Sequence, residues 1–381
     1  MMKLEAILAV LCTIGAGLGA AVTPQQATNS IPKVEILEAK NFRDLGAKRA
    51  RITYGPYVVP GSEDATTHGM KTFQELPALM PCRECLITSY APDLVFADGK
   101  PANANREMWL HHIGLSNMNR TDTACASRNW PERISVNGNE RSSFDMTVKG
   151  TQKAGYYVRK NDTIFLATDA MNIDEKPQTV YLAIDYEYIE GTPDGFDIVF
   201  PVWLDFKGNC LNESTGAWQG EAFEAKSKTS FTAPWSANLI LMVPHTHDGN
   251  TKQEVFLNGT SICQNVPGYG ETAEFVSHVN EHGHDHDHGS SEHVLHVSSI
   301  SQCSDVIKTN PRDRFTISST YSMKEHPAMK DHDGSLEPIM GIEFLHFARP
   351  RDEAIKDILA MPEPNLQSFL DQVAENNAKP H

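Results

Sequence analysis

The sequence predicts an all-β protein made of two tandem antiparallel β-sandwich domains followed by a short helical tail. Between about residues 50 and 350, short apolar segments alternate with turn residues. The segment TVYLAIDYEY at 179–188 has an apolar side chain at every second position, the pattern of a strand with one buried face. No helical segments separate these strands, which favours antiparallel sandwiches over a parallel α/β sheet.

The turn-rich segment GTPDG at 191–195 lies between two strong strand patterns and is the predicted domain boundary. We therefore expect an N-terminal sandwich over residues 32–192 and a C-terminal sandwich over residues 196–350. Residues 351–381 contain two segments with helical spacing, separated by two prolines, and form the predicted tail.

The first twenty residues form the only long apolar run, with Lys3 near its start and small residues at its end. This pattern predicts a signal peptide over residues 1–20 and a secreted, extracellular protein, because the run is too short for a typical membrane anchor. Lys plus Arg number 33 and Asp plus Glu number 49, so the net charge is −16. We expect a monomer without nucleic-acid or membrane partners, since phosphate binding needs clustered basic residues.

Six cysteines remain after the predicted signal peptide, and an even number in an oxidising compartment predicts up to three structural disulfides without fixing their pairing. They are Cys82, Cys85, Cys125, Cys210, Cys263 and Cys303. Cys82 and Cys85 form a C-x-x-C motif, but no second pair accompanies it to make a zinc site. Four sequons predict N-glycosylation at exposed turns. Their asparagines are Asn119, Asn161, Asn212 and Asn258.

The segment 278–296 carries seven of the sixteen histidines, interleaved with polar residues and glycine. Such a segment does not bury a core, so we expect a flexible insertion between strands. It would collect copper or zinc at neutral pH, or be a tolerated loop that binds metal only adventitiously. We do not place catalysis there.

Three short motifs outside that segment offer metal ligands. His245 and His247 follow an apolar strand. Residues two apart in a strand project to the same side, so both imidazoles can reach one metal. The alternative is a pair of exposed turn histidines. His111 and His112 are adjacent, so sharing a metal requires a β-bulge or a strand end; the alternative is that one of the pair is a packed or solvent-exposed histidine. Met340 opens a late strand and is either core or a soft ligand suited to monovalent copper.

The order HH, then HTH, then Met at the start of a late strand resembles the type II copper, ascorbate-dependent monooxygenases, such as peptidylglycine α-hydroxylating monooxygenase and dopamine β-monooxygenase. The segments PCRECLITSY, LVFADG and MWLHHIGLSN are similar to a secreted fungal branch of this fold. The resemblance implies two jelly-roll sandwiches of eight or nine strands. It also implies a catalytic copper that activates dioxygen on His245, His247 and Met340, and a second copper on His111 and His112 that relays electrons from ascorbate.

The sequence departs from that family at the second copper, where the family has a third histidine. No histidine occurs between His112 and His245. Met171 or Asn172 lies near the expected place, and His68 upstream is another substitute. One copper is therefore expected at the HTH motif and a second one only if the HH pair suffices.

The leading hypothesis is a secreted, copper-dependent, monooxygenase-like oxidoreductase that uses ascorbate or another reductant on a small-molecule or peptide substrate. The alternative is a non-catalytic extracellular copper-binding or cell-surface protein that retains the fold. A third hypothesis is a structural sandwich without a tight metal site.

Overall fold

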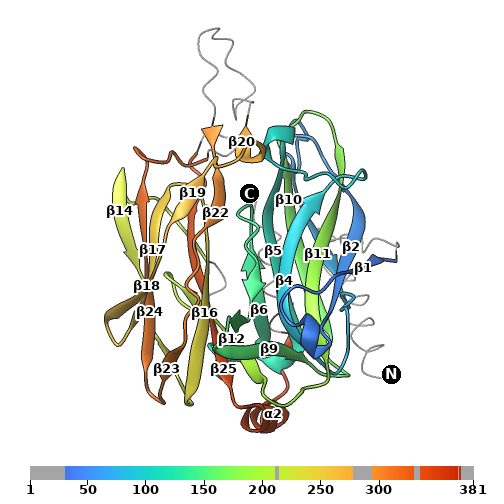
Figure 1. Ribbon diagram of the computed structural model, residues 1–381. Coiled ribbons are helices and arrows are strands. Elements are labelled where there is room, and N and C mark those ends of the chain that lie inside the picture. Colours follow the sequence, from blue (N-terminus) through green and yellow to red (C-terminus); the bar gives the residue numbers. More distant parts are fainter. Residues whose placement is uncertain (1–30, 211–213, 278–293, 330–334, 368, 370–381) are drawn as a thin grey trace.

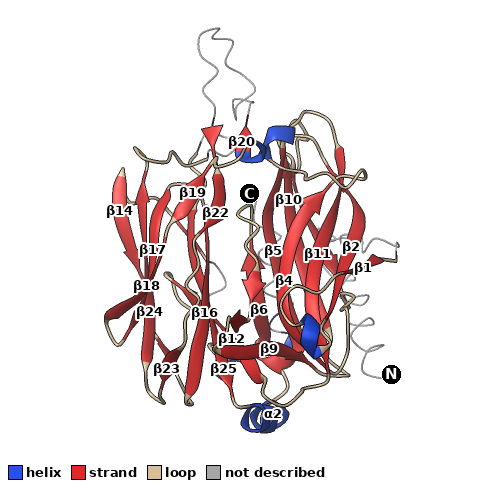
Figure 2. Cartoon of the chain, viewed as in Figure 1, coloured by secondary structure: helices blue, strands red, loops and turns tan. Residues whose placement is uncertain are grey.

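The computed structural model describes residues 31–210, 214–277, 294–329, 335–367 and 369. These residues form many β-strands and little helix, so the all-β prediction is confirmed (Figure 2). Helix α2 (Arg351–Ala360) follows the last strand, as predicted for the start of the tail. The predicted signal peptide and most of the second tail segment lie outside the described residues. In the described part of the chain, no helix is long and apolar enough to cross a membrane.

The first sandwich packs two sheets around one apolar core (Figure 1). One sheet has the order β1 (Lys33–Leu37), β2 (Lys48–Val59), β11 (Gln178–Glu190), β4 (Cys85–Val95), β9 (Gln152–Val158). The other has the order β3 (Met70–Glu75), β10 (Ile164–Asn172), β5 (Met108–Thr121), β6 (Pro131–Asn137). The short strands β7 (Phe144–Asp145) and β8 (Thr147–Val148) pair with β4 and β9.

The second sandwich repeats this plan around a second core. Its inner sheet has the order β12 (Asp197–Asp205), β25 (Ile339–Arg349), β16 (Ala237–Thr246), β23 (Ile307–Thr309). Its outer sheet has the order β14 (Ala222–Lys226), β24 (Arg314–Ser322), β17 (Asn250–Leu257), β18 (Thr260–Asn265). Shorter strands complete it: β13 (Thr215–Gly216), β15 (Phe231–Thr232), β19 (Pro267–Tyr269), β20 (Val276–Ser277), β21 (Val294–Leu295) and β22 (Val297–Ile300).

One continuous sheet runs through both sandwiches, because β9 and β12 pair in parallel and join a sheet of each. Strand β25 is buried along its whole length. Met340, Ile342 and Phe344 contribute to the first core, whereas Leu345 and Phe347 contribute to the second. Since side chains alternate between the faces of a strand, the inner sheet of the second sandwich also packs against the first sandwich. The jelly-roll strand count stays a prediction.

The predicted structural disulfides are confirmed, with the pairs Cys82–Cys85, Cys125–Cys210 and Cys263–Cys303. The second pair joins the chain after β5 to the chain after β12 and so links the two sandwiches covalently.

Three of the four predicted glycosylation sites are exposed, namely Asn119, Asn161 and Asn258. Asn212 lies outside the described residues. Glycosylation itself stays a prediction.

His346 on β25 gives the fold a pH-dependent stability. Its imidazole is fully buried beside the rings of Phe144 and Phe344, and burial lowers its pKa from 6.5 to about 4. The unfolded chain therefore binds the proton first as the pH falls. Its contribution to stability is lost between 6.5 and about 4, at up to about 1.4 kcal/mol per pH unit.

We expect His346→Phe to lose less free energy of unfolding than the wild type on acidification, with a difference of about 2 kcal/mol near pH 5. Denaturant unfolding of the two metal-free proteins, at about pH 7 and about pH 5, measures this difference. Equal losses in both proteins would contradict the assignment.

Candidate metal centre

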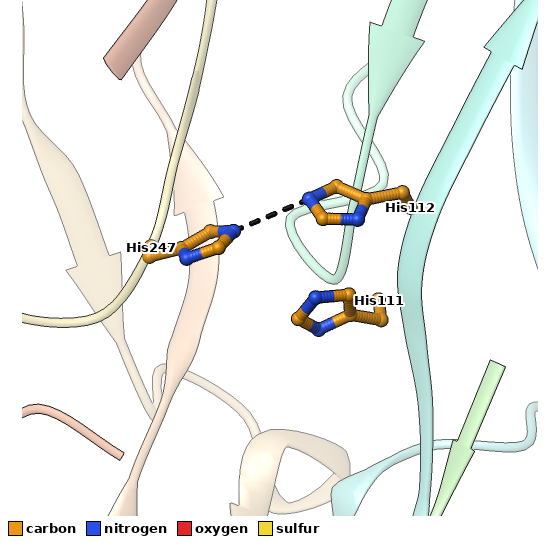
Figure 3. A group of neighbouring side chains, drawn as sticks. All are labelled: His111, His112 and His247. Atoms are coloured by element: carbon orange, nitrogen blue, oxygen red, sulfur yellow. Dashed lines mark hydrogen bonds between the residues drawn. The ribbon is translucent and has the colours of Figure 1, made fainter. Parts of the chain in front are cut away.

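Three histidines meet between the two sandwiches. His111 and His112 lie on β5, and His247 follows β16. One ring nitrogen from each lies within 4.8 Å of the others. His112 and His247 point toward each other from opposite sides, with His111 beside them (Figure 3), and the Nε2 atoms of His112 and His247 are 3.2 Å apart.

A β-bulge lets the adjacent histidines share this space. In the pairing of β5 with β10, His112 lies opposite Asp169 and Leu110 lies opposite Ala170, so His111 is the extra residue. The two imidazole centroids are 4.2 Å apart. Adjacent side chains of a regular strand would face opposite ways, so the bulge meets the condition that the sequence set for the HH pair.

His245 lies next to this group. It pairs across the sheet with Ile342, whose side chain belongs to the first core, so His245 also faces the first sandwich. Its ring centroid is 5.1 Å from that of His112 and 5.9 Å from that of His247. The resemblance implied two copper sites in separate domains, whereas the structure gathers both histidine pairs into one group between the domains.

A small cavity of about 40 Å³ borders this group. Its walls are formed by Trp109, His111, Asn139, Glu140, His245, Thr246, His247, Asp248, Val297, Met329 and Glu337. Met340 is not among them, although it neighbours His247, whose N–H donates to the Met340 carbonyl oxygen at 3.4 Å. The thioether on the cavity wall belongs to Met329, and Met340 as a ligand stays a prediction.

The outer nitrogens of two rings fix where their protons lie. His247 Nδ1 is 2.7 Å from the carbonyl oxygen of Pro338, which only accepts, so Nδ1 carries the proton. His112 Nδ1 is 3.3 Å from Asp169 Oδ2, and the other oxygen of that carboxylate accepts a hydrogen bond from Thr72 Oγ1. Both rings therefore turn the lone pair of Nε2 inward, toward each other.

The Nε2 lone pairs of His112 and His247 face each other and repel unless a cation binds both. Burial lowers the pKa of His112. Burial, and then the neighbouring His112 and His245, lower the pKa of His247 well below its usual value. Both imidazoles are neutral at neutral pH, so neither supplies a proton to the 3.2 Å contact between their Nε2 atoms. A metal ion bound by these nitrogens removes the repulsion, so the residues present fit a metal.

Sequence reasoning missed the carboxylates around the imidazoles. Asp169 and Glu140 each approach an imidazole Nδ1, and Glu337 Oε1 lies 3.7 Å from His111 Nε2 and 3.5 Å from His247 Nδ1. Only Asp169 had a signal, since it lies in the strand where the family has its third histidine.

Two of the substitutes weighed for that third histidine, His68 and Asn172, do not join the cluster, and Met171 as a ligand stays a prediction. His68 is not among the grouped ligands. The Asn172 amide donates to the carbonyl oxygens of Pro60 and Lys176, which is a structural role. Met171 lies opposite Trp109 in the pairing of β10 with β5.

The C-terminal end of the histidine-rich segment is part of the folded structure, contrary to the prediction. Residues 278–293 lie outside the described part, but His296 is fully buried, with Nδ1 2.6 Å from Asp248 Oδ2. Its ring meets Trp109 edge to face. A flexible insertion reaching residue 296 is therefore wrong over residues 294–296, because β21 pairs with β20 and because Asp248 and Trp109 hold the His296 imidazole.

The chain is similar to two fungal proteins. The chain is 27% identical over 308 residues to the probable copper-dependent oxygenase M1 of a Phoma species, covering 79% of this chain and 73% of that protein. It is 26% identical over 257 residues to the probable copper-dependent oxygenase clz3 of Cochliobolus lunatus, covering 68% of this chain and 77% of that protein. No protein-family model matches, so membership of the ascorbate-dependent monooxygenase family is not established.

Among solved structures, a peptide-N(4)-(N-acetyl-β-D-glucosaminyl) asparagine amidase aligns over 80% of this chain and 97% of its own, at 11% identity and a TM-score of 0.40. The PNGF-II structure gives 10% identity and a TM-score of 0.37, over 79% of this chain and 66% of its own.

The lowered pKa values of His112 and His247 make metal binding resistant to mild acid. We expect the affinity for Cu²⁺ to fall less steeply, as the pH is lowered from neutral to 6.5, than at a site whose imidazoles all have ordinary pKa values, because protons compete weakly for His112 and His247. Competition titration with a chelator across this range measures the affinity. A decline as steep as that of a site built from ordinary imidazoles would contradict the described electrostatics.

Proposed function

We propose that this chain is a copper-dependent oxygenase that acts outside the cell and takes electrons from an external reductant such as ascorbate. The observation that carries the proposal is the 3.2 Å approach of two imidazole Nε2 atoms whose protons lie on the far side of each ring. The names of the two fungal relatives support copper over zinc, since imidazole suits both ions. Three disulfides agree with an oxidising compartment.

His111, His112 and His247 would hold the ion. Copper bound there would supply one-electron redox chemistry toward dioxygen. Three imidazoles leave open positions for small molecules, as in other catalytic metal sites.

The surrounding residues define what reaches the metal. The Glu337 carboxylate lies within 3.7 Å of His111 and 3.5 Å of His247, so it can hold a proton beside the cavity. A cavity of about 40 Å³ admits a molecule of a few atoms only. An organic substrate, whether a small molecule or a peptide, would therefore dock at the mouth, next to Val297 and Met329 on the wall.

Removing one imidazole from each sandwich tests the site. In the full chain, with the six histidines of 278–293 replaced by asparagine to remove background binding, we expect one tightly held copper and ascorbate-dependent oxygen consumption. His112→Ala and His247→Ala should each weaken copper binding by more than about tenfold and abolish oxygen consumption. Metal analysis, EPR and an oxygen electrode provide the measurements.

His68→Asn is the matched control. His68 lies outside the cluster and has a φ of 47°, which asparagine tolerates, so copper binding and oxygen consumption should be unchanged. If the wild type holds no copper, the proposal fails. If it holds copper but consumes no oxygen with ascorbate, the chain is a copper-binding protein rather than an oxygenase.

Met340 and Met329 are both candidates for a thioether ligand. The family resemblance favours Met340, whereas the cavity wall favours Met329. If Met340 binds copper, Met340→Leu should remove a copper–sulfur distance from the X-ray absorption spectrum of the reduced protein, and Met329→Leu should leave it. The opposite pattern would assign the sulfur to Met329 and contradict the assignment to Met340.

A further inference from the structure

We propose that Glu140 is a positioning residue that holds His245 as a fourth imidazole donor of the metal centre. The inference rests on the proposed function, because it assumes that the clustered histidines bind copper. It goes further in naming a carboxylate from one sandwich that orients a ligand from the other.

The Glu140–His245 pair is buried and crosses the domain interface. Glu140 Oε1 lies 2.8 Å from His245 Nδ1, and both side chains are 2% exposed. A carboxylate accepts, so Nδ1 carries the proton and Nε2 carries the lone pair. A buried carboxylate on the outer nitrogen of a metal-binding histidine fixes its tautomer and orientation and makes the inner nitrogen more basic.

The turn that carries Glu140 is well fixed. Asn137 closes it through its side-chain amide, which donates to the Ser142 carbonyl oxygen at 2.5 Å and accepts from the Ser142 N–H at 3.0 Å. The N–H of Gly138 donates to Glu140 Oε1 at 3.0 Å. The carboxylate is therefore held in place by its own turn as well as by His245.

The inner nitrogen of His245, Nε2, has no hydrogen-bond partner among the described residues. This nitrogen is also buried. A buried acceptor without a partner costs about 1–3 kcal/mol. His245 is not among the three imidazoles whose nitrogens lie within 4.8 Å of one another. Its ring centroid lies 5.1 Å from that of His112 and 5.9 Å from that of His247, so the ring would move toward an ion bound by those imidazoles to give Nε2 a partner.

Gly138 keeps the space for this ring. A Cβ at position 138 would lie 2.6 Å from His245 Cε1 and 2.9 Å from the carbonyl oxygen of His111. Any side chain there displaces the imidazole. The same Cβ would lie 3.0 Å from Glu140 Oε2, so the position supports His245 both directly and through Glu140.

The experiment counts imidazoles on Cu²⁺ by pulsed EPR and measures copper affinity by chelator competition. It uses the full chain with the histidines of 278–293 replaced by asparagine. We expect four coordinated imidazoles in the wild type and three in His245→Ala. Glu140→Ala should also fall to three and weaken affinity by roughly 10–100-fold. The isosteric Glu140→Gln keeps an acceptor for Nδ1–H and should recover the fourth imidazole and most of the affinity.

Gly138→Ala is the second variant, in case Glu140→Ala does not fold, and it should also show three imidazoles. Three imidazoles in the wild type, with no change of count or affinity in His245→Ala, would overturn the inference while leaving the oxygenase proposal intact. Four imidazoles retained in both Glu140→Ala and Gly138→Ala would overturn the role of Glu140. A wild type that binds no copper would overturn both proposals.

Discussion

The burial of one sheet on both faces is the constraint on which the rest of the structure depends. Strand β25 gives alternate side chains to two cores, so the sheet that completes the second sandwich also covers the first. A sheet packed on both sides leaves little freedom for one sandwich to slide over the other. The C-terminal end of β16 and the N-terminal part of β5 are thereby brought together, and with them the two histidine motifs.

The polar groups at the interface, like the histidines, come from both sandwiches. Each imidazole of the group has an oxygen acceptor close by, and the acceptors come from both sandwiches: Asp169 and Glu140 from the first, Pro338 and Glu337 from the second. Around His112, His245 and His247 these acceptors direct protons outward and lone pairs inward, which disfavours an empty centre and favours an occupied one. Burying these polar groups costs free energy locally, which is typical of a binding site and not of an apolar core.

The sequence predicted those features that depend on short stretches of the chain or on a count of residues. Period-two alternation marked the strands, the even number of cysteines predicted disulfides, and the requirement for a bulge at His111 followed from strand geometry alone. The merging of the two histidine pairs was not predictable in this way, since it depends on which face of β25 packs against the first sandwich. Glu140 and Asp169 were missed because acidic residues near strand ends are common. His296 was misassigned because composition does not reveal a buried partner such as Asp248.

The Cys125–Cys210 disulfide gives the split centre a kinetic property. It ties the chain just beyond β5, which carries two of the imidazoles, to the sandwich that carries the others. If the noncovalent interface opens, the two half-sites remain on a short covalent tether, and their effective concentration stays far above that of separate molecules. An ion that left one half-site would therefore still have the other half-site close by, as the second donor of a chelate stays near an ion that has left the first.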